Sequence, residues 1–245
     1  MEPGTYGRAL VTGAASGIGA ATVARLLADG MKVAALDLDA RGLASLDATC
    51  RVVADVSSED DVRRAVDEAA AALGGLDTIV TCAGVALLGT VEASFEEWQR
   101  TFAVNVSGVY LVARAALPYL RAAGGGAIVN VASNLGLVAT EGAAAYCASK
   151  GAVIQLTRAM ALDHGREGIR VNAVCPGPTE TPMVKGWLGT YPDPDAARAF
   201  LEQNHLHGRL IRPDEIAAAI AYLISPGASS VFGVVLTVDA GFTIR

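Results

Sequence analysis

Short apolar runs alternate along the chain with segments whose apolar residues recur at helical spacing. The apolar runs are typical of strands at residues 8–11, 31–37, 50–56, 76–84, 124–133, 169–177 and 233–241. The helical segments lie at residues 20–30, 57–73, 94–120, 144–165 and 212–225. Strands that alternate with helices across short loops predict a parallel sheet covered on both faces. We therefore expect an α/β fold, a doubly wound sheet of about seven strands, in a single domain spanning residues 1–245.

One segment, residues 183–208, breaks this alternation. Its periodicity is weak, and Trp187, Tyr191, Pro192 and Pro194 interrupt it. An irregular segment of this kind is typical of a mobile flap over a ligand site. Trp187, Tyr191 and His205 are candidates for contact with a substrate, with packing at the surface as the alternative.

Composition narrows the possible functions. Hydrophobic residues make up 52% of the chain and charged residues 18%, which argues against disorder. The formal net charge of -6 offers no basic face for nucleic acid. The first residues, MEPGTYGRALVTG, lack the pattern of a secretory signal, and no uninterrupted apolar run approaches membrane-spanning length. We expect a soluble cytoplasmic protein, with Cys50, Cys82, Cys147 and Cys175 as reduced thiols.

A glycine-rich loop follows the first predicted strand and leads into a helix. TGAASGIG, residues 12–19, holds glycines that allow a tight turn, close approach of the backbone to a pyrophosphate, and close packing of helix on strand. The flanking strand and helix are the context that this motif requires, so we expect a dinucleotide site, with an ordinary turn as the alternative. The loop residues assigned to the cofactor are Gly13, Ser16, Gly17, Ile18 and Gly19.

Acidic residues end the next two predicted strands. Asp37 lies eighteen residues after Gly19, where a carboxylate can accept hydrogen bonds from the ribose hydroxyls of NAD and repels the 2′-phosphate of NADP. A helix cap or a solvated loop is the alternative for Asp37, and Arg41 partly offsets the repulsion. Asp55, followed by Val56, is a candidate for the adenine edge, with helix capping as its alternative. The sequence thus favours NAD over NADP.

The best candidates for chemistry lie between Ala132 and Lys150. If the run that begins near Ala144 is helical, Tyr146 and Lys150 lie one turn apart on the same face, and a nearby positive charge favours the phenolate. Such a tyrosine can exchange a proton with a hydroxyl or carbonyl oxygen. Ser133 ends an apolar run, at the sheet edge where open α/β folds bind ligands. By spacing alone, a solvated pair is the alternative for Tyr146 and Lys150.

These motifs occur together, and together they resemble the short-chain dehydrogenase/reductase family over essentially the whole chain. TGAASGIG matches the family's TGxxxGIG loop, Tyr146 and Lys150 match its YxxxK, and Ser133 stands thirteen residues before Tyr146. Asn105 lies inside a predicted helix, where its amide by itself indicates a structural or solvated residue. The resemblance instead implies a catalytic tetrad of Asn105, Ser133, Tyr146 and Lys150, in which Asn105 holds a water in a proton relay.

The resemblance also implies an activity and a cofactor, in a doubly wound fold of the Rossmann type. The expected reaction is the reversible oxidation of a secondary alcohol to a ketone with NAD. Tyr146 would be the general acid/base, Ser133 would orient the substrate oxygen, and Lys150 would also hold the ribose. The turn at Pro176 and Gly177, together with Thr181, is expected to meet the nicotinamide carboxamide. The expected cofactor contacts beyond the loop and the acids are Ala83, Gly84, Tyr146, Lys150, Pro176, Gly177, Thr179 and Thr181.

Two other functions stay open at this point. An NADPH-dependent reductase of ketones, such as 3-oxoacyl thioesters, is an alternative that Asp37 disfavours. A non-catalytic sensor or scaffold that binds a dinucleotide is an alternative that the intact tetrad disfavours. The resemblance implies a homotetramer or homodimer built through the two helices that carry Asn105 and Tyr146.

The chain departs from the family pattern in small ways. Cys82 replaces the second Asn of the family's NNAG, which puts the hydrogen bonds of that strand in doubt, and DAG at Asp239 replaces the commoner DGG. His205 and His207 form an HxH pair without a third ligand, so we expect no metal site. The pocket beside Tyr146 is expected to include Asn134, Leu135, Glu141 and Ala143, with a solvated loop position as the alternative for Glu141.

Overall fold

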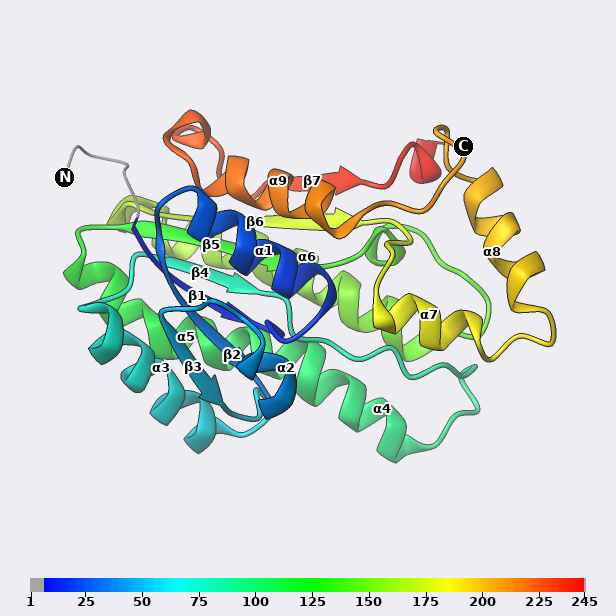
Figure 1. Cartoon of the computed structure of the whole chain (residues 1–245), viewed down its shortest axis with the longest axis horizontal. Helices are drawn as coiled ribbons and strands as arrows, with labels where there is room; N and C mark the ends of the chain where they lie inside the picture. The colour runs from blue at the N-terminus through cyan, green and yellow to red at the C-terminus, as the bar shows by residue number, and fades with distance from the viewer. Residues whose placement is uncertain (1–6, 245) are drawn as a thin grey trace.

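Residues 7–244, which the computed structural model describes, contain seven strands in one parallel sheet of order β3-β2-β1-β4-β5-β6-β7 (Figure 1). The strands are β1 (Arg8–Thr12), β2 (Lys32–Asp37), β3 (Cys50–Val53), β4 (Thr78–Thr81), β5 (Gly126–Val131), β6 (Ile169–Pro176) and β7 (Val235–Val238). The predicted doubly wound α/β fold is confirmed. The first six residues, on which the prediction of no secretory signal partly rests, lie outside the described part of the chain.

Helices cover both faces of the sheet. On one face α1 (Gly17–Ala28) packs beside α9 (Pro213–Ile224), and on the other lie α3 (Glu59–Leu73), α5 (Gly108–Ala122) and α6 (Ala144–His164) (Figure 1). The ends of α3 show why a helix forms there: the Ser58 hydroxyl accepts a hydrogen bond from the Asp61 amide, and Gly74 ends the helix in the left-handed conformation. The shorter helices are α2 (Ala40–Ala44), α4 (Phe95–Phe102), α7 (Pro182–Leu188) and α8 (Pro194–Gln203).

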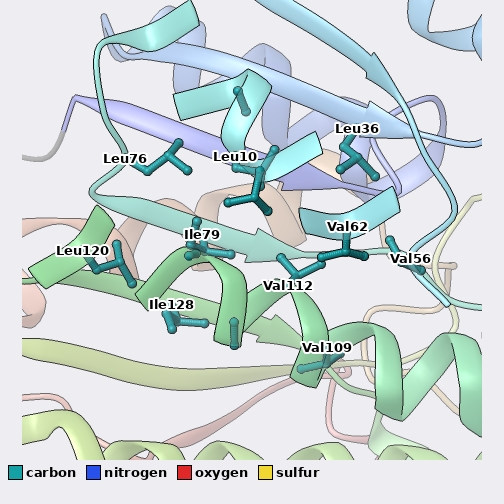
Figure 2. Packing of buried hydrophobic residues seen from close by; sticks show 14 of the residues in the cluster. Leu10, Leu36, Val56, Val62, Leu76, Ile79, Val109, Val112, Leu120 and Ile128 are labelled. Carbon is teal, nitrogen blue, oxygen red and sulfur yellow. The ribbon is translucent and has the colours of Figure 1, made fainter. Parts of the chain in front are cut away.

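The strands are apolar at consecutive positions because both faces of the sheet are buried. Leu10 of β1 packs with Leu36 of β2, Val62 of α3 and Val112 of α5 on one face (Figure 2). The next residue, Val11, belongs to the cluster under α1 and α9. Successive side chains of a strand point to opposite faces, so a continuous apolar run is what a sheet covered on both sides requires.

The predicted helix over residues 94–120 is a helical segment whose pitch changes in the middle. α4 ends at Phe102, a π-helical turn spans Ala103–Ser107, and α5 follows from Gly108. A π-helical turn re-aims the side chains around it and is frequent at functional sites. The span Phe95–Ala122 is long and apolar enough to cross a membrane by length and composition, but 44% of its most apolar window is buried in the fold, where α5 packs on α3.

The aperiodic segment 183–208 contains most of α7 and all of α8. Pro182 and Pro194 occupy the first turns of these helices, where an amide hydrogen is not needed, and the side chains of Thr181 and Asp193 cap them. Both helices lie beyond one end of the sheet and away from the helices that cover its faces (Figure 1). Because each helix is only two or three turns long, its apolar period is too brief to be recognised in the sequence.

Candidate active site

A groove with a volume of about 380 Å³ lies at the carboxyl edge of the sheet, where the strand order reverses between β1 and β4. Gly13, at φ 63°, comes so close to β4 that a Cβ there would lie 2.6 Å from the Ala83 amide nitrogen. A Cβ on Gly19 would lie 2.0 Å from the Gly13 carbonyl oxygen. Only glycine fits these positions, and it leaves the amino terminus of α1 open to an anion.

Asp37 and Asp55 both line this groove, and each carboxylate also holds the nearby backbone. Asp37 accepts hydrogen bonds from the Ala15 and Asp39 amides, both at 2.9 Å, and Asp55 accepts from the amide and hydroxyl of Ser57. A carboxylate has about four acceptor sites, so these bonds leave capacity for a ribose or an adenine. The contacts of both acids with a cofactor stay predictions.

The predicted cofactor residues divide between this groove and a larger cavity beside it. The groove is lined by Gly13, Ser16, Gly17, Ile18, Gly19, Asp37, Asp55, Val56, Ala83 and Gly84. The cavity is lined by Tyr146, Lys150, Pro176, Gly177 and Thr179. Ile18, Gly84 and Thr181 line both spaces, which places the boundary between groove and cavity at these residues.

Ser133, Tyr146 and Lys150 meet in the larger cavity. Ser133 follows the end of β5, and the first two turns of α6 carry the other two side chains. Lys150 Nζ lies 5.7 Å from the centroid of the Tyr146 ring. A Cβ on Gly84 would lie 3.5 Å from Lys150 Nζ and 3.3 Å from Asn105 Oδ1, so all members of the predicted tetrad converge near the end of β4.

Burial moves the pKa values of Tyr146 and Lys150 toward the neutral forms. Lys150 is 4% exposed, its Nζ donates to the Val131 carbonyl at 2.9 Å, and desolvation lowers its pKa to about 8. Desolvation raises the pKa of Tyr146 to about 12, against a hydrogen bond to Ser133 that lowers it. Desolvation therefore opposes the phenolate, and the expectation that Lys150 makes Tyr146 basic near neutral pH stays a prediction.

Asn105 is completely buried in the π-helical turn, which excludes the solvated position and agrees with the structural one. Its Oδ1 accepts from the Val85 amide at 2.8 Å, and its Nδ2 donates to the Val85 carbonyl at 2.9 Å and to the Ser149 hydroxyl at 3.0 Å. Ser149 in turn donates to the Tyr146 carbonyl at 2.7 Å. Asn105 thus ties the segment after β4 to the start of α6, and its role in a water relay stays a prediction.

The larger cavity has a volume of about 530 Å³ and a mainly apolar wall. Of the residues expected beside Tyr146, it is lined by Asn134, Leu135 and Ala143. Glu141 is exposed and does not line the cavity, so its alternative as a solvated loop acid holds. Its position follows from the loop before α6, which turns this side chain outward to solvent.

The segment 183–208 supplies much of the opposite wall. Trp187 and Tyr191 line the cavity, with their rings 6.0 Å apart, and Met183 and Phe200 lie beside them in the lining. His205, the third aromatic candidate, is buried outside the lining, and its ring lies 6.3 Å from that of Phe242. Residues of α7 and α8 thus supply part of the cavity wall, and the flap over the site, with its mobility, stays a prediction.

Comparison with known proteins identifies the family. The family model described as enoyl-(acyl carrier protein) reductase matches residues 13–243. The cis-4-hydroxycyclohexanecarboxylate dehydrogenase of Sinomonas cyclohexanicum is 44% identical over 245 residues, 96% of either chain. The D-threitol dehydrogenase of Mycolicibacterium smegmatis is 40% identical over 97% of this chain and 93% of its own. The chain belongs to the short-chain dehydrogenase/reductase family.

A solved structure agrees with this assignment. A variant of the actinorhodin polyketide ketoreductase, determined with NADPH, matches the whole of both chains with a TM-score of 0.93 and 34% sequence identity. As a short-chain dehydrogenase/reductase, the protein is an oxidoreductase that acts on CH–OH groups. The predicted family and enzyme class are confirmed.

Cys82, which departs from the usual sequence of these dehydrogenases, leaves β4 well connected. The Cys82 amide donates to the Thr12 carbonyl at 3.2 Å, and the Thr81 hydroxyl donates to Asn130 Oδ1 at 2.8 Å. Asn130 continues this chain of bonds to the Thr157 hydroxyl at 2.9 Å. Burial raises the pKa of the Cys82 thiol to about 12, so it is a neutral group in the wall of both spaces.

Several lining residues of this dehydrogenase were missed from the sequence. Arg100, Ala103 and Val104 line the groove, and their spacing places them on one helical face without showing what that face meets. Phe242 lines the cavity from the end of the chain, and no sequence pattern marks it. Within residues 7–244 no group of three or more His, Cys, Asp or Glu side chains is arranged to hold a metal ion.

Proposed function

We propose that this protein is an NAD-dependent dehydrogenase that interconverts a secondary alcohol and a ketone, with Tyr146 as the general acid/base. The observation that carries the proposal is the meeting of Ser133, Tyr146 and Lys150 in one cavity that shares its boundary with the glycine-lined groove. A reacting carbon beside Tyr146 would then lie next to the place where the groove delivers a hydride acceptor.

The residues of the groove fit a dinucleotide. Gly13 and Gly19 are sites that a Cβ would fill, and they let an anion approach the amino terminus of α1. Asp37 suits two ribose hydroxyls and repels a phosphate ester at the same place, which supports NAD over NADP. When bound, oxidised NAD supplies the hydride acceptor and a positively charged ring that favours the phenolate of Tyr146.

Side chains of the protein would transfer the proton of the substrate hydroxyl. The Ser133 hydroxyl, which lines the same cavity as Tyr146, would hold the substrate oxygen, and Tyr146 would take the hydroxyl proton during oxidation or return it during reduction. Lys150, desolvated beside the ring, would stabilise the phenolate and hold a ribose hydroxyl. Asn105 would support a proton path by keeping Val85 and the start of α6 in place, with a water at its carbonyl.

Replacement of Tyr146 by Phe tests this proposal. The Tyr146→Phe variant keeps the ring and loses the proton carrier, so we expect kcat to fall by a factor of about 10² to 10⁴ while the Kd for NAD changes little. A panel of ring and chain secondary alcohols, followed by NADH absorbance, supplies the assay. Tyr222→Phe, on the exposed end of α9, is the matched control and should match the wild type. A Tyr146→Phe enzyme with wild-type turnover would contradict the proposal.

An NADPH-dependent ketone reductase is the second candidate. It is favoured by the likeness to a polyketide ketoreductase with NADPH and by the description of the matching family model. Asp37 disfavours it, and we expect kcat/KM with NAD to exceed that with NADP at least about tenfold. Asp37→Asn should lower this ratio, because the amide keeps an acceptor for Ala15 and removes the repelling charge. A wild-type preference for NADPH would establish the second candidate.

We also propose a homotetramer or homodimer, formed through α5 and α6. Aromatic side chains are exposed on this side of the molecule, with Phe95 at 71% on α4 and Tyr110 at 46% on α5. Burial of such side chains against a second copy would be favourable. Light scattering after size exclusion measures the assembly. The four free cysteines support the cytoplasm as its location, which cell fractionation tests.

A further inference from the structure

Asn134 is a buried amide in the wall of the larger cavity. It follows Ser133 and begins the 3-10 turn Asn134–Gly136, which comes directly after the end of β5. The side chain is 2% exposed and lines the cavity together with Ser133 and Tyr146. Its position is therefore set by the end of β5, in the wall of the space that a substrate would fill.

The two ends of this amide differ in their hydrogen bonds. Oδ1 accepts from the Ser133 hydroxyl at 3.3 Å. Nδ2 has no acceptor among the residues that the structure describes. The amide groups of Asn105, Asn130 and Asn172, which are equally buried, donate to Val85 and Ser149, to Thr157 and to Val231. A buried donor without an acceptor is unfavourable, so Asn134 is an exception that a ligand would explain.

We propose that Asn134 Nδ2 donates a hydrogen bond to a second oxygen of the substrate. The proposal rests on the proposed function and makes Asn134 a specificity-determining residue of that reaction. Because Oδ1 and Nδ2 share one carbon, Nδ2 lies within about 6 Å of the Ser133 oxygen. A substrate oxygen held by Ser133 and a second oxygen held by Nδ2 can therefore belong to neighbouring or nearly neighbouring carbons.

The rest of the wall defines the remainder of this substrate. Leu88, Leu135, Trp187 and Phe200 line the cavity around the polar corner at Ser133 and Asn134. An apolar wall with few polar groups binds the carbon skeleton and leaves the polar groups to fix its orientation. The substrate class is thus a secondary alcohol with a second hydroxyl, carbonyl or carboxylate oxygen close by and an apolar remainder.

Pairs of alcohols that differ only by methyl in place of hydroxyl test the class. Suitable pairs are trans-cyclohexane-1,2-diol with trans-2-methylcyclohexanol, and butane-2,3-diol with 3-methylbutan-2-ol, each with saturating NAD. We expect kcat/KM of the wild-type enzyme to favour the diol at least about tenfold, because the methyl compound leaves Nδ2 unpaired. A ratio near one in both pairs overturns the inference, while turnover of the methyl compounds still supports the proposed function.

Two variants test whether Asn134 Nδ2 causes the preference for the diol. Asn134→Asp keeps the shape and the acceptor for Ser133 and removes the donor, and Asn134→Leu removes both. In each variant we expect the diol-to-methyl ratio to fall at least about tenfold. Asn172→Asp is the matched control. Asn172 lies on β6 and lines neither space, and its replacement removes the hydrogen bond from Nδ2 to the Val231 carbonyl. This variant should have a lower melting temperature and an unchanged ratio of diol to methyl compound.

The outcomes separate the inference from the proposed function. A ratio that stays within about twofold of wild type in both Asn134 variants, with NAD binding retained in calorimetry, overturns the role of Nδ2. If one variant does not fold, the other and the wild-type ratio decide the question. No turnover of any pair by the wild type overturns the proposed function, and this inference falls with it.

Discussion

The groove and the cavity meet at Gly84, yet their walls are built in different ways. Backbone and short side chains at the ends of β1 to β4 form much of the groove, and a Cβ on Gly13 or Gly19 would collide with backbone atoms there. The cavity is enclosed by side chains from α7, α8 and the chain end. A backbone wall permits very few residue types, whereas a wall of apolar side chains accepts substitution at modest cost.

This difference predicts that the groove tolerates few substitutions, whereas the cavity tolerates many. The shape of the groove is held by the ends of the strands and by the close backbone contacts at Gly13 and Gly19. The cavity can change its ligand when a few side chains of α7 and α8 change, because these helices lie outside the two layers that bury the sheet (Figure 1).

The largest effect is expected from Gly19→Ala in the groove. Its methyl carbon would lie 2.0 Å from the Gly13 carbonyl oxygen, so the loop or α1 must move, and the Kd for NAD should rise by at least about a hundredfold or the protein should fail to fold. Calorimetric titration with NAD measures this. Gly186→Ala on α7 is the control: an added Cβ meets open space, and helix propensity predicts unchanged or slightly higher stability. Normal NAD binding by Gly19→Ala would break the comparison.

A smaller effect is expected from Trp187→Ala on the cavity side. Loss of the ring removes apolar contact with a substrate, so KM for the alcohol should rise about tenfold while the Kd for NAD stays within about twofold. Lys185→Ala on the exposed side of the same helix should change neither constant. If Trp187→Ala raised the Kd for NAD as much as the KM for the alcohol, the groove and the cavity would not act independently.

A third effect concerns stability at Lys150, which lines the cavity. Below about pH 8 this buried lysine is charged in both the folded and the unfolded protein, so the folded state carries the whole desolvation penalty. Lys150→Met should therefore be more stable by about 1 to 3 kcal/mol at pH 7, or a few degrees in melting temperature, although it loses turnover. The gain should fade as pH rises from about 8 toward 10.5, where the unfolded lysine also becomes neutral.

Thermal unfolding of the wild type and of Lys150→Met across this pH range checks the sign. The difference between the two proteins cancels the contributions of the buried cysteines, whose raised pKa values lower stability at high pH in both. Lys185→Met, on an exposed lysine, is the control and should show no such trend. A difference that grew with pH would contradict the assignment of a desolvated cation.

The sequence by itself determined the sheet, the glycine loop and the acids at the strand ends. Apolar runs and helical patterns are local, and Gly13 and Gly19 mark contacts between segments that adjoin in the chain or in neighbouring strands. Ser133, Tyr146 and Lys150 were found by spacing and resemblance, because a motif preserves the order of the groups that a reaction needs.

Only the tertiary structure decided the burial of Asn105, the neutral bias of Tyr146 and Lys150, and the wall of the cavity. These properties depend on segments that are distant in the sequence. Val85 is hydrogen-bonded to Asn105, and Phe242 lines the same cavity as residues of α7 and α8, and local patterns do not encode such contacts. The unpaired Nδ2 of Asn134 also could not be predicted from the sequence, because it depends on where the acceptors of the other described residues lie. Desolvation and hydrogen-bond satisfaction arise from all surrounding groups together, so they exist only once the chain has folded.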